Sequence, residues 1–417
     1  MSDQLLGDSA EWLLRLNNHS TNERYALGTA ARWASVAKRF LLFLEKRRMA
    51  VEAAQPEDVE QFLREELRRY RRRHGSPSAY RDWRSARTDA VHALLRLAQG
   101  QWPPVLSAVT PAERFCHVTC EEYLRWMTDL RGLAQATASV RCEEACRFIE
   151  WLGPQAAPQV MEALDVTDVD RYMRDRSGSL HRSSMKTVAT WVRDFLRWLH
   201  TTKQTRRDLS TAVIAPSAYA LESVPLALKF ADIEKVLAVT RQDRTAKGIR
   251  DYAILLLLAK YGARAGEIVR LRLDDIDWRK DFVRIRHSKT GTTSCLPLLP
   301  EVGEAVLEYL QKARPQTTFR EIFIRNRAPY RPFKSGTSLG RLVGNRLDNA
   351  GMVISGKRGT HVFRHARAVS LLRAATPLKV IGDLLGHRAS SSTMVYLKLA
   401  TEDLRAISLE VPAEVTA

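Results

Sequence analysis

The first half of the chain carries the same series of helical segments twice, and this repeat restricts it to two similar helical bundles. In each copy, aromatic and aliphatic residues recur at the spacing of a buried helix face. Any two amphipathic helices match to some degree, but three matches in the same order favour a duplication. The matching segments are residues 37–44 with 145–152, 57–65 with 167–175, and 91–97 with 192–198. Three prolines between residues 99 and 115 disfavour helix and mark the joint. We therefore expect bundles over residues 1–105 and 106–215.

The hydrophobic pattern changes beyond the second bundle. Pro216 and Pro225 bracket a stretch without a strong period, so we place a linker at residues 216–223. Farther on, residues 274–300 alternate apolar and polar side chains around the turn sequence SKTGTT, which predicts a small antiparallel sheet with a hairpin tip. Helical patterns lie before and after it. The expected fold is mainly α, with helical bundles followed by an α+β domain over residues 224–417.

The charge of the chain favours a polyanionic partner. Its formal net charge is +19 and its sequence pI is about 10.0. Lys and Arg near phosphates release condensed counterions, so we expect nucleic acid rather than a merely basic surface. The densest basic run, at residues 66–76, is interpreted as a patch that follows the phosphates with Tyr70 beside them; a solvated helix end is the alternative. The candidate DNA-binding residues are Arg68, Arg69, Arg71, Arg72 and Arg73.

The sequence shows no sign of membrane insertion or secretion. No apolar run approaches the roughly 20 residues that a membrane span needs. The N-terminus has neither the basic start nor the apolar core of a signal peptide. We expect a cytoplasmic protein with reduced thiols and no membrane partner. In a bacterium it would lie in the cytoplasm or on the nucleoid.

Four of the five cysteines form two pairs of equal spacing, Cys116 with Cys120 and Cys142 with Cys146. Paired thiols can bind zinc, with His117 as a further ligand. They can also be small residues on two helices, because positions four apart share a helix face in either case. The second pair lies within a periodic helix and not in the turn-rich loop that zinc sites favour. We therefore predict no metal, and keep a zinc-dependent binding module as an alternative.

Two cationic residues of the third region stand where they could bind a phosphate. Arg264 follows a glycine near a helix end and lies three residues before Glu267, which could hold its guanidinium still. Lys289 stands at the tip of the predicted hairpin, from which it could reach a site on another element. Taken singly, each has an ordinary explanation, since surface ion pairs and solvated turn lysines are common.

Residues 361–399 carry an unusual number of hydrogen-bond donors. Thr360 is a candidate helix N-cap, which places His361, Arg364 and His365 in or near the first turn of a helix. Free backbone donors and the positive end of the helix dipole make such a turn an anion site.

A second helix is expected after Pro377, with Gly386 as its C-terminal stop. His387 follows directly, and Tyr396 comes nine residues later between two apolar neighbours. A tyrosine in such surroundings is usually a core residue with its hydroxyl bonded. The functional interpretation therefore depends on the whole set of residues.

In chain order the set is Arg264, Lys289, His361, Arg364, His387 and Tyr396. It resembles the tyrosine recombinase/integrase family, whose catalytic domain carries Arg, Lys, His-x-x-Arg, His or Trp, and Tyr in that order. The motifs GARAGE, HVFRHARA and LLGH match as well. The resemblance covers residues 224–404 and touches the second bundle, which looks like the family's DNA-clamping core-binding domain. The N-terminal bundle departs from the usual two-domain layout, and would be an arm or a duplicated core-binding-like domain.

The resemblance implies a site-specific recombinase that cuts and rejoins double-stranded DNA without metal, ATP or another cofactor. Tyr396 would attack the phosphodiester and hold the DNA 3′ end as a phosphotyrosine. Arg264 and Arg364 would bind the non-bridging oxygens as charge builds on phosphorus. Lys289 would protonate the departing 5′ oxygen.

The remaining polar residues take supporting roles in this scheme. His361 and His387 would donate hydrogen bonds to the phosphate or manage the tyrosine proton. Glu267 and His365 would hold these groups in place. The sequence has neither a phosphate-binding P-loop nor an acidic metal cluster, which agrees with chemistry that needs no nucleotide.

Residues 400–411 have the pattern of one more short amphipathic helix. In this family such a tail commonly docks on a neighbouring subunit, which implies a homotetramer on DNA; packing on its own domain is the alternative. We favour integration, excision or transposition of a mobile element as the process served. The extra bundle could read a longer site or contact an accessory protein.

Two rival functions share the fold. A type IB topoisomerase-like or telomere-resolving enzyme would use the same nucleophile with a different outcome. A DNA-binding regulator would keep the fold without the catalysis, and the intact set of six residues speaks against it.

Overall fold

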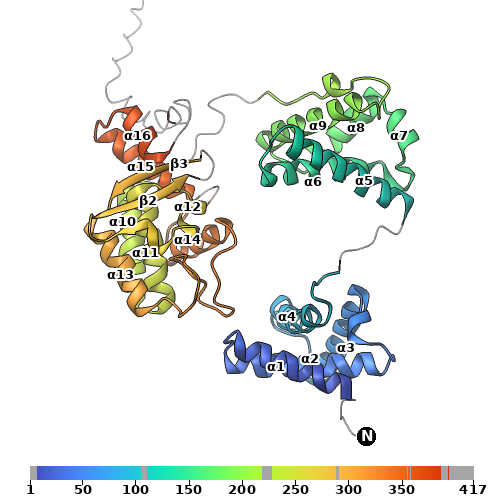
Figure 1. Cartoon of the computed structure of the whole chain (residues 1–417), viewed down its shortest axis with the longest axis horizontal. Helices are drawn as coiled ribbons and strands as arrows, with labels where there is room; N and C mark the ends of the chain where they lie inside the picture. Colours follow the sequence, from blue (N-terminus) through green and yellow to red (C-terminus); the bar gives the residue numbers. More distant parts are fainter. Residues whose placement is uncertain are drawn as a thin grey trace, which may run out of the picture. The chain divides into compact units, whose positions relative to one another are not determined.

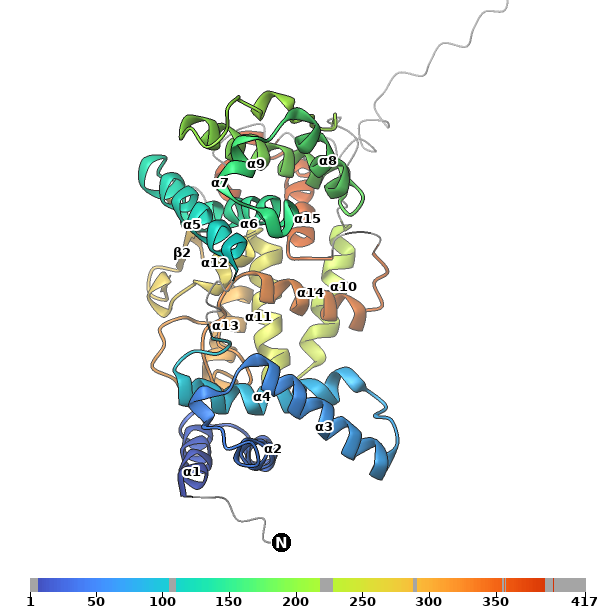
Figure 2. The same cartoon turned by 90° about the vertical axis from the view of Figure 1, so that its right-hand side faces the viewer.

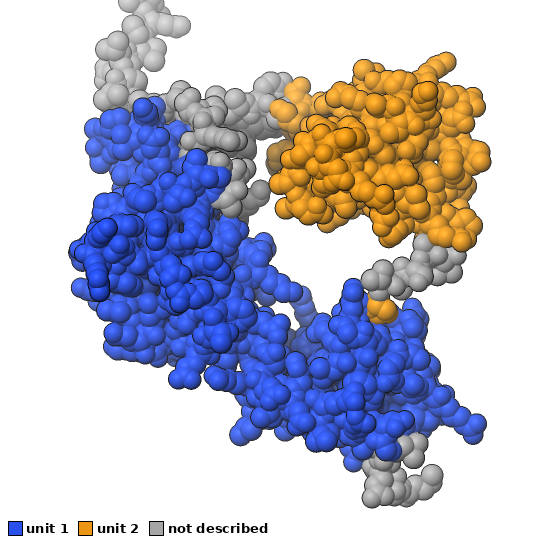
Figure 3. Space-filling view, viewed as in Figure 1, with its two compact units in different colours: residues 1–103, 224–417 blue, residues 104–223 orange. Residues whose placement is uncertain are grey.

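A computed structural model of the chain describes residues 7–104, 110–217, 228–287, 291–354, 356, 358–386 and 393. By its contacts the chain divides into two compact units, one of Pro104–Ser223 and one of Met1–Pro103 with Val224–Ala417 (Figure 3). The described residues contain three large hydrophobic cores, each drawn from one continuous stretch of sequence. None of the described helices has both the length and the apolar character needed to cross a bilayer.

The N-terminal bundle consists of α1 (Gly7–Asn22), α2 (Leu27–Glu45), η1 (Val51–Ala53), α3 (Pro56–His74) and α4 (Tyr80–Gln99) (Figure 1). Helix α4 packs against both α1 and α2. Helix α3 begins where the sequence supplies a start signal. Pro56 occupies its first turn, where a missing N–H is harmless, and Gln55 forms a capping box with Asp58.

The unit of Pro104–Ser223 is wholly helical in its described part. Its elements are α5 (Pro111–Arg125), the π-helical turn η2 (Trp126–Leu130), α6 (Gln135–Trp151), η3 (Gly153–Gln155), α7 (Pro158–Glu162), α8 (Val166–Ser177), α9 (Arg182–Thr201) and η4 (Ser210–Ala212). Helix α5 begins at a capping box, in which Thr110 and Glu113 each accept the other's backbone N–H. Helices α5 and α6 pack directly against each other.

The repeated segments occupy matching helices in the two bundles. Phe40 and Phe62, on α2 and α3, meet edge to face with 5.1 Å between ring centroids. The aligned residues Phe148 and Tyr172, on α6 and α8, meet at 4.8 Å and the same interplanar angle of 72°. All four rings are fully buried. One pair of positions thus forms the same contact in both bundles, which supports an internal duplication.

The third region contains the only sheet among the described residues. It comprises α10 (Phe230–Gln242), α11 (Ala246–Tyr261), α12 (Ala265–Val269), η5 (Leu273–Asp275), β1 (Ile276–Asp277), β2 (Phe282–His287), β3 (Thr292–Pro297), α13 (Pro300–Lys312), α14 (Thr337–Asn349), α15 (His361–Arg373) and α16 (Leu378–Leu385). The strands pair antiparallel in the order β1-β2-β3. The predicted fold class, mainly α with a small antiparallel sheet, is confirmed.

Helix α11 is the centre of this region. It contacts α10, α13 and α15, and Figure 2 shows it running between α10 and α13. Its apolar run from Ala253 to Ala259 is buried throughout, which is why the sequence shows almost no polar face there. At its end, Tyr261 donates its hydroxyl to the carbonyl of Pro297 at 2.7 Å and accepts from the amide of Leu299 at 3.0 Å. These bonds fix the end of the sheet to the end of α11.

Candidate active site

Helix α11 ends at a glycine that no other residue could replace without strain. Gly262 is left-handed, with φ of 61°, and its amide bonds to the carbonyl of Leu258. A Cβ at this position would lie 2.7 Å from Cδ2 of Leu385. The turn therefore needs glycine both for its backbone angle and for the close approach of α16. Arg264 follows two residues later and is the N-cap of α12.

Glu267 holds Arg264 from two sides. One carboxylate oxygen accepts the backbone N–H of Arg264 at 2.7 Å, and the other accepts Nη1 of its guanidinium at 2.9 Å. The acid that the sequence placed one turn away is thus paired with this arginine. Burial raises the pKa of Glu267, but the hydrogen bonds from His287 and Arg264 outweigh it, and the pKa lies below its ordinary value. The carboxylate is therefore ionised at neutral pH.

His287, the last residue of β2, completes this arrangement and was not predicted. It is 2% exposed, and its Nδ1 lies 2.8 Å from Oε1 of Glu267 while its Nε2 lies 2.8 Å from the hydroxyl of Ser294. An ionised carboxylate can only accept, so Nδ1 is the donor. The sequence signal that could have indicated His287 is the alternation of buried and exposed residues along β2. This alternation puts His287 on the buried face with Val283 and Ile285.

Arg364 joins the ends of two helices. It lies in the first turns of α15, is 3% exposed, and donates Nη1 to the carbonyl of Gly262 at 2.8 Å and Nη2 to that of Leu385 at 2.6 Å. Arg264 donates Nη2 to the carbonyl of Gly386, at 3.3 Å. The two arginines, far apart in the sequence, thus converge on the turn that ends α16.

Gly386 brings this turn against the sheet. It is left-handed, with φ of 62°, and stops α16 as predicted. A Cβ added to it would lie 2.6 to 2.7 Å from ring atoms of His287. The end of α16 and the end of β2 are therefore in direct contact at the same place where the arginines meet.

We expect Gly386→Ala to lower the free energy of unfolding of this region by roughly 2–4 kcal/mol. Alanine is less stable than glycine in the left-handed backbone conformation, and its Cβ would also overlap the His287 ring. Gly351→Ala is the matched control, because Gly351 is also left-handed but has open space around its Cβ. Urea unfolding of both variants measures the difference. Equal losses in the two would show that contact with His287 is unimportant.

The two histidines of α15 differ in their surroundings. His361 is exposed at the first residue of the helix, and its ring centroid lies 6.0 Å from that of His365. His365 is half-buried; burial, and then the charges of His361 and Arg364, lower its pKa to about 4. It is therefore neutral at pH 7. Thr360 precedes the helix as predicted, but its backbone is helical and its side chain makes no capping bond, so that part of the prediction is wrong.

The lowered pKa of His365 makes the stability of this region depend on pH. The unfolded chain, with a histidine pKa near 6.5, binds the proton more tightly than the folded protein does. Acidification from about pH 6.5 to pH 4 should therefore favour unfolding. We expect His365→Gln to flatten the fall of the urea midpoint over this window, whereas the same change at exposed His74 should leave the slope as in the wild type. An unchanged slope in His365→Gln would contradict the assignment.

Three residues of the predicted set, Lys289, His387 and Tyr396, lie outside the described residues, and so does the predicted tail helix at 400–411. In the sequence, Lys289 comes two residues after His287, and His387 comes directly after Gly386. The described residues therefore bring together Arg264, Glu267 and Arg364, with His361 and His365 on the same helix as Arg364.

The predicted basic run lies at the C-terminal end of α3 in the N-terminal bundle. Arg69 forms ion pairs with Glu65 at 3.9 Å and with Glu66 at 3.6 Å. Tyr70, predicted to lie beside the phosphates, packs its ring against Trp83 with 5.8 Å between centroids. All five arginines of the run, Arg68, Arg69, Arg71, Arg72 and Arg73, are exposed.

Comparisons with known proteins identify the family. Residues 227–403 match the model of the phage integrase family. A protein of Sinorhizobium fredii (strain NBRC 101917 / NGR234) named as an integrase/recombinase, y4gC, is 54% identical over 189 residues, which are 45% of this chain and 97% of that protein. The chain belongs to the phage integrase family. The resemblance to tyrosine recombinases and integrases that the sequence carries is confirmed.

Members with other names share longer stretches with the chain. The tyrosine recombinase XerD of Ralstonia nicotianae (strain ATCC BAA-1114 / GMI1000) is 28% identical over 318 residues, 73% of this chain and 94% of XerD. Among solved structures, a lambda integrase tetramer bound to a Holliday junction superposes with a TM-score of 0.52 at 17% identity, over 75% of this chain and 86% of that chain. At this identity the likeness shows the integrase fold alone.

Proposed function

We propose that this member of the phage integrase family is a site-specific recombinase that cuts and rejoins double-stranded DNA through a 3′-phosphotyrosine at Tyr396. The observation that supports it best is the convergence of two arginines. Arg264 comes from the turn between α11 and α12, Arg364 comes from α15, and both donate to carbonyls at the end of α16. Two guanidinium groups beside one turn place two cationic, forked donors where one phosphate could be bound.

Two guanidinium groups at one place suit a phosphate whose charge increases during reaction. Arg264 is held by Glu267, and Glu267 is held in turn by His287, so the donor is fixed before DNA arrives. Donors that need no reorganisation stabilise the transition state more than the ground state. In the proposed mechanism Arg264 and Arg364 bind the non-bridging oxygens of the scissile phosphate.

The proton transfers are assigned to residues named by the sequence order of the family. A free phenol has a pKa near 10, so Tyr396 needs a cationic site to lose its proton. It then attacks phosphorus, and Lys289 protonates the leaving 5′ oxygen. His361 and His387 donate to the phosphate or relay the tyrosine proton. The energy of the broken bond stays in the protein–DNA link, so rejoining needs no nucleotide and no metal.

The experiment that tests this function uses a nicked duplex carrying a candidate end of a mobile element, in buffer with a chelator. We expect a covalent adduct that survives SDS, at one mapped position on the DNA. Relaxation of plasmids without any required site would favour the topoisomerase-like alternative. Tight binding to the same duplex without an adduct would favour the DNA-binding regulator.

We also propose that the protein acts as a homotetramer on DNA, with the tail at residues 400–417 docking on a neighbouring subunit. The lambda integrase of the superposed structure is a tetramer, and the tail sequence is amphipathic.

The basic run of α3 would extend the DNA contacts, because its exposed arginines can neutralise phosphates. Integration, excision or transposition of a mobile element is the process we favour.

Deleting residues 400–417 should impair assembly more than DNA binding. We expect the truncated chain to bind a single half-site with nearly the affinity of the full chain, and to lose the higher-order complexes and the recombinant product. Gel-shift titration and native mass determination on DNA measure the two properties separately. A truncated chain that still recombines normally would show that the tail does not dock in trans.

A further inference from the structure

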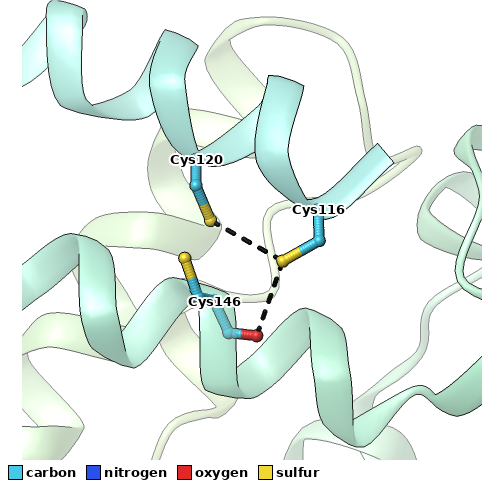
Figure 4. A group of neighbouring side chains, drawn as sticks. All are labelled: Cys116, Cys120 and Cys146. Carbon is cyan, nitrogen blue, oxygen red and sulfur yellow. Dashed lines mark hydrogen bonds between the residues drawn. The ribbon is translucent and has the colours of Figure 1, made fainter. Parts of the chain in front are cut away.

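Helices α5 and α6 bring together thiols that lie in two separate sequence pairs. The Sγ atoms of Cys116 and Cys120 on α5 and of Cys146 on α6 all lie within 4.8 Å of one another. The sulfurs of Cys116 and Cys120 are 4.0 Å apart. Figure 4 shows the three sulfur atoms pointing toward one another in the space between the two helices. This convergence is a property of the helix packing and is not implied by either pair alone.

The fourth cysteine borders the same cluster. Cys142 lies one turn before Cys146 on α6, and its thiol donates to the carbonyl of Cys120 at 3.2 Å. A change of rotamer would turn its sulfur without moving the backbone of either helix. Three thiols therefore converge from the two helices, and Cys142 is the candidate for a fourth ligand.

The distance between the two α5 sulfurs suits one small ion. Zinc binds thiolate sulfur at about 2.3 Å in tetrahedral sites, which places neighbouring sulfurs roughly 3.8 Å apart. The separation of 4.0 Å between Cys116 and Cys120 is close to that value, and it is far too long for a disulfide bond, which measures about 2.05 Å. A [4Fe–4S] cluster would hold each thiolate on a different iron, and so farther apart than this pair.

The cluster is reachable from solvent. Cys116, Cys120, Cys142 and Cys146 all line a surface pocket of about 960 Å³ in this unit, together with Glu113 and His117. An ion can thus enter without unfolding the helices. His117 is exposed and its ring lies 3.7 Å from the carboxylate of Glu121, so it is not aimed at the sulfurs.

We propose that Cys116, Cys120, Cys142 and Cys146 bind one zinc ion that cross-links α5 to α6. Four thiolates close the coordination sphere, so the ion is structural and has no open position for catalysis. From the sequence we predicted no metal, because one cysteine pair lies inside a helix. In the structure, two packed helices bring the pairs together, so a zinc site here does not need a turn-rich loop. The proposal does not depend on the recombination chemistry.

The first test is the metal content of the purified full-length chain after expression with added zinc. We expect about one zinc per chain, released by a thiol-modifying reagent. After removal of zinc, Co²⁺ should produce the charge-transfer and visible bands of tetrahedral thiolate coordination. The Cys120→Ser/Cys146→Ser variant should lose both signals. Cys295→Ser is the matched control, because Cys295 is exposed on β3 in the other unit, and it should keep both.

The second test measures stability and does not require a variant to fold. A chelator should lower the melting midpoint of this unit by roughly 10 °C in the wild type and in Cys295→Ser, with recovery on adding zinc. A wild-type chain with no bound zinc, no cobalt spectrum and no response to chelator would overturn the proposal. So would zinc that stays bound in the double variant, or a disulfide between α5 and α6 found by mass spectrometry under reducing growth.

Discussion

Replacing Tyr396 with phenylalanine is expected to abolish the covalent protein–DNA adduct while leaving DNA affinity almost unchanged. Phenylalanine keeps the ring and lacks the only atom that can attack phosphorus in the proposed mechanism. The assay is denaturing gel electrophoresis of a labelled nicked duplex after incubation with each protein. Affinity is measured on the same duplex by titration at fixed salt, because protein–DNA binding changes steeply with salt concentration.

A tyrosine elsewhere in the same region supplies the control for this experiment. Tyr252→Phe, on the half-buried side of α11, removes a hydroxyl without touching the proposed site. We expect it to form the adduct at the wild-type rate. An adduct that persists in Tyr396→Phe would mean that another residue is the nucleophile, and the proposed role of Tyr396 would be wrong.

Arg264→Ala is expected to slow DNA cleavage by roughly 10²–10³-fold at saturating protein, with a much smaller change in affinity. The guanidinium is proposed to act on charge that develops during reaction, whereas the many other cationic residues supply ground-state binding. Arg264→Lys should rescue little of the rate. A lysine is a point charge, and it cannot bond to Glu267 and the carbonyl of Gly386 while also presenting a forked donor to phosphate.

Single-turnover cleavage of the nicked duplex measures this effect. Arg279→Ala serves as the comparison, because Arg279 is an exposed arginine between β1 and β2 whose loss changes the net charge equally. We expect its cleavage rate to stay near the wild-type value. If the two variants lost the same activity, the effect would belong to overall charge and not to the position of Arg264.

Much of the fold could be read from hydrophobic periodicity. The repeated segments fell on matching helices because a buried face imposes its spacing whatever the partner is. Alternation over residues 274–300 predicted the sheet, and glycine chemistry predicted the end of α16 at Gly386. Within the site, the pairing of Arg264 with Glu267 could be predicted, because Arg264 is the N-cap of a short helix and Glu267 lies three residues later in its first turn.

The parts that the sequence did not reveal depend on contacts between distant elements. His287 bonds to Glu267 across the packing of β2 against α12, and no local pattern encodes that partner. The cysteine pairs looked like ordinary helix positions until the packing of α5 on α6 faced them toward each other. Thr360 stands at a helix start, yet its backbone continues the helical turn and leaves its hydroxyl without a capping role.

The position of the turn at Gly386 limits how far the proposed nucleophile can lie from the two arginines. Tyr396 is ten residues beyond Gly386 in the sequence, so an extended chain could carry it at most roughly 35 Å from that point. In the proposed tetramer, a neighbouring subunit's site that lies within that radius could receive Tyr396. Handing the tyrosine to a neighbour would therefore require no melting of α15 or α16.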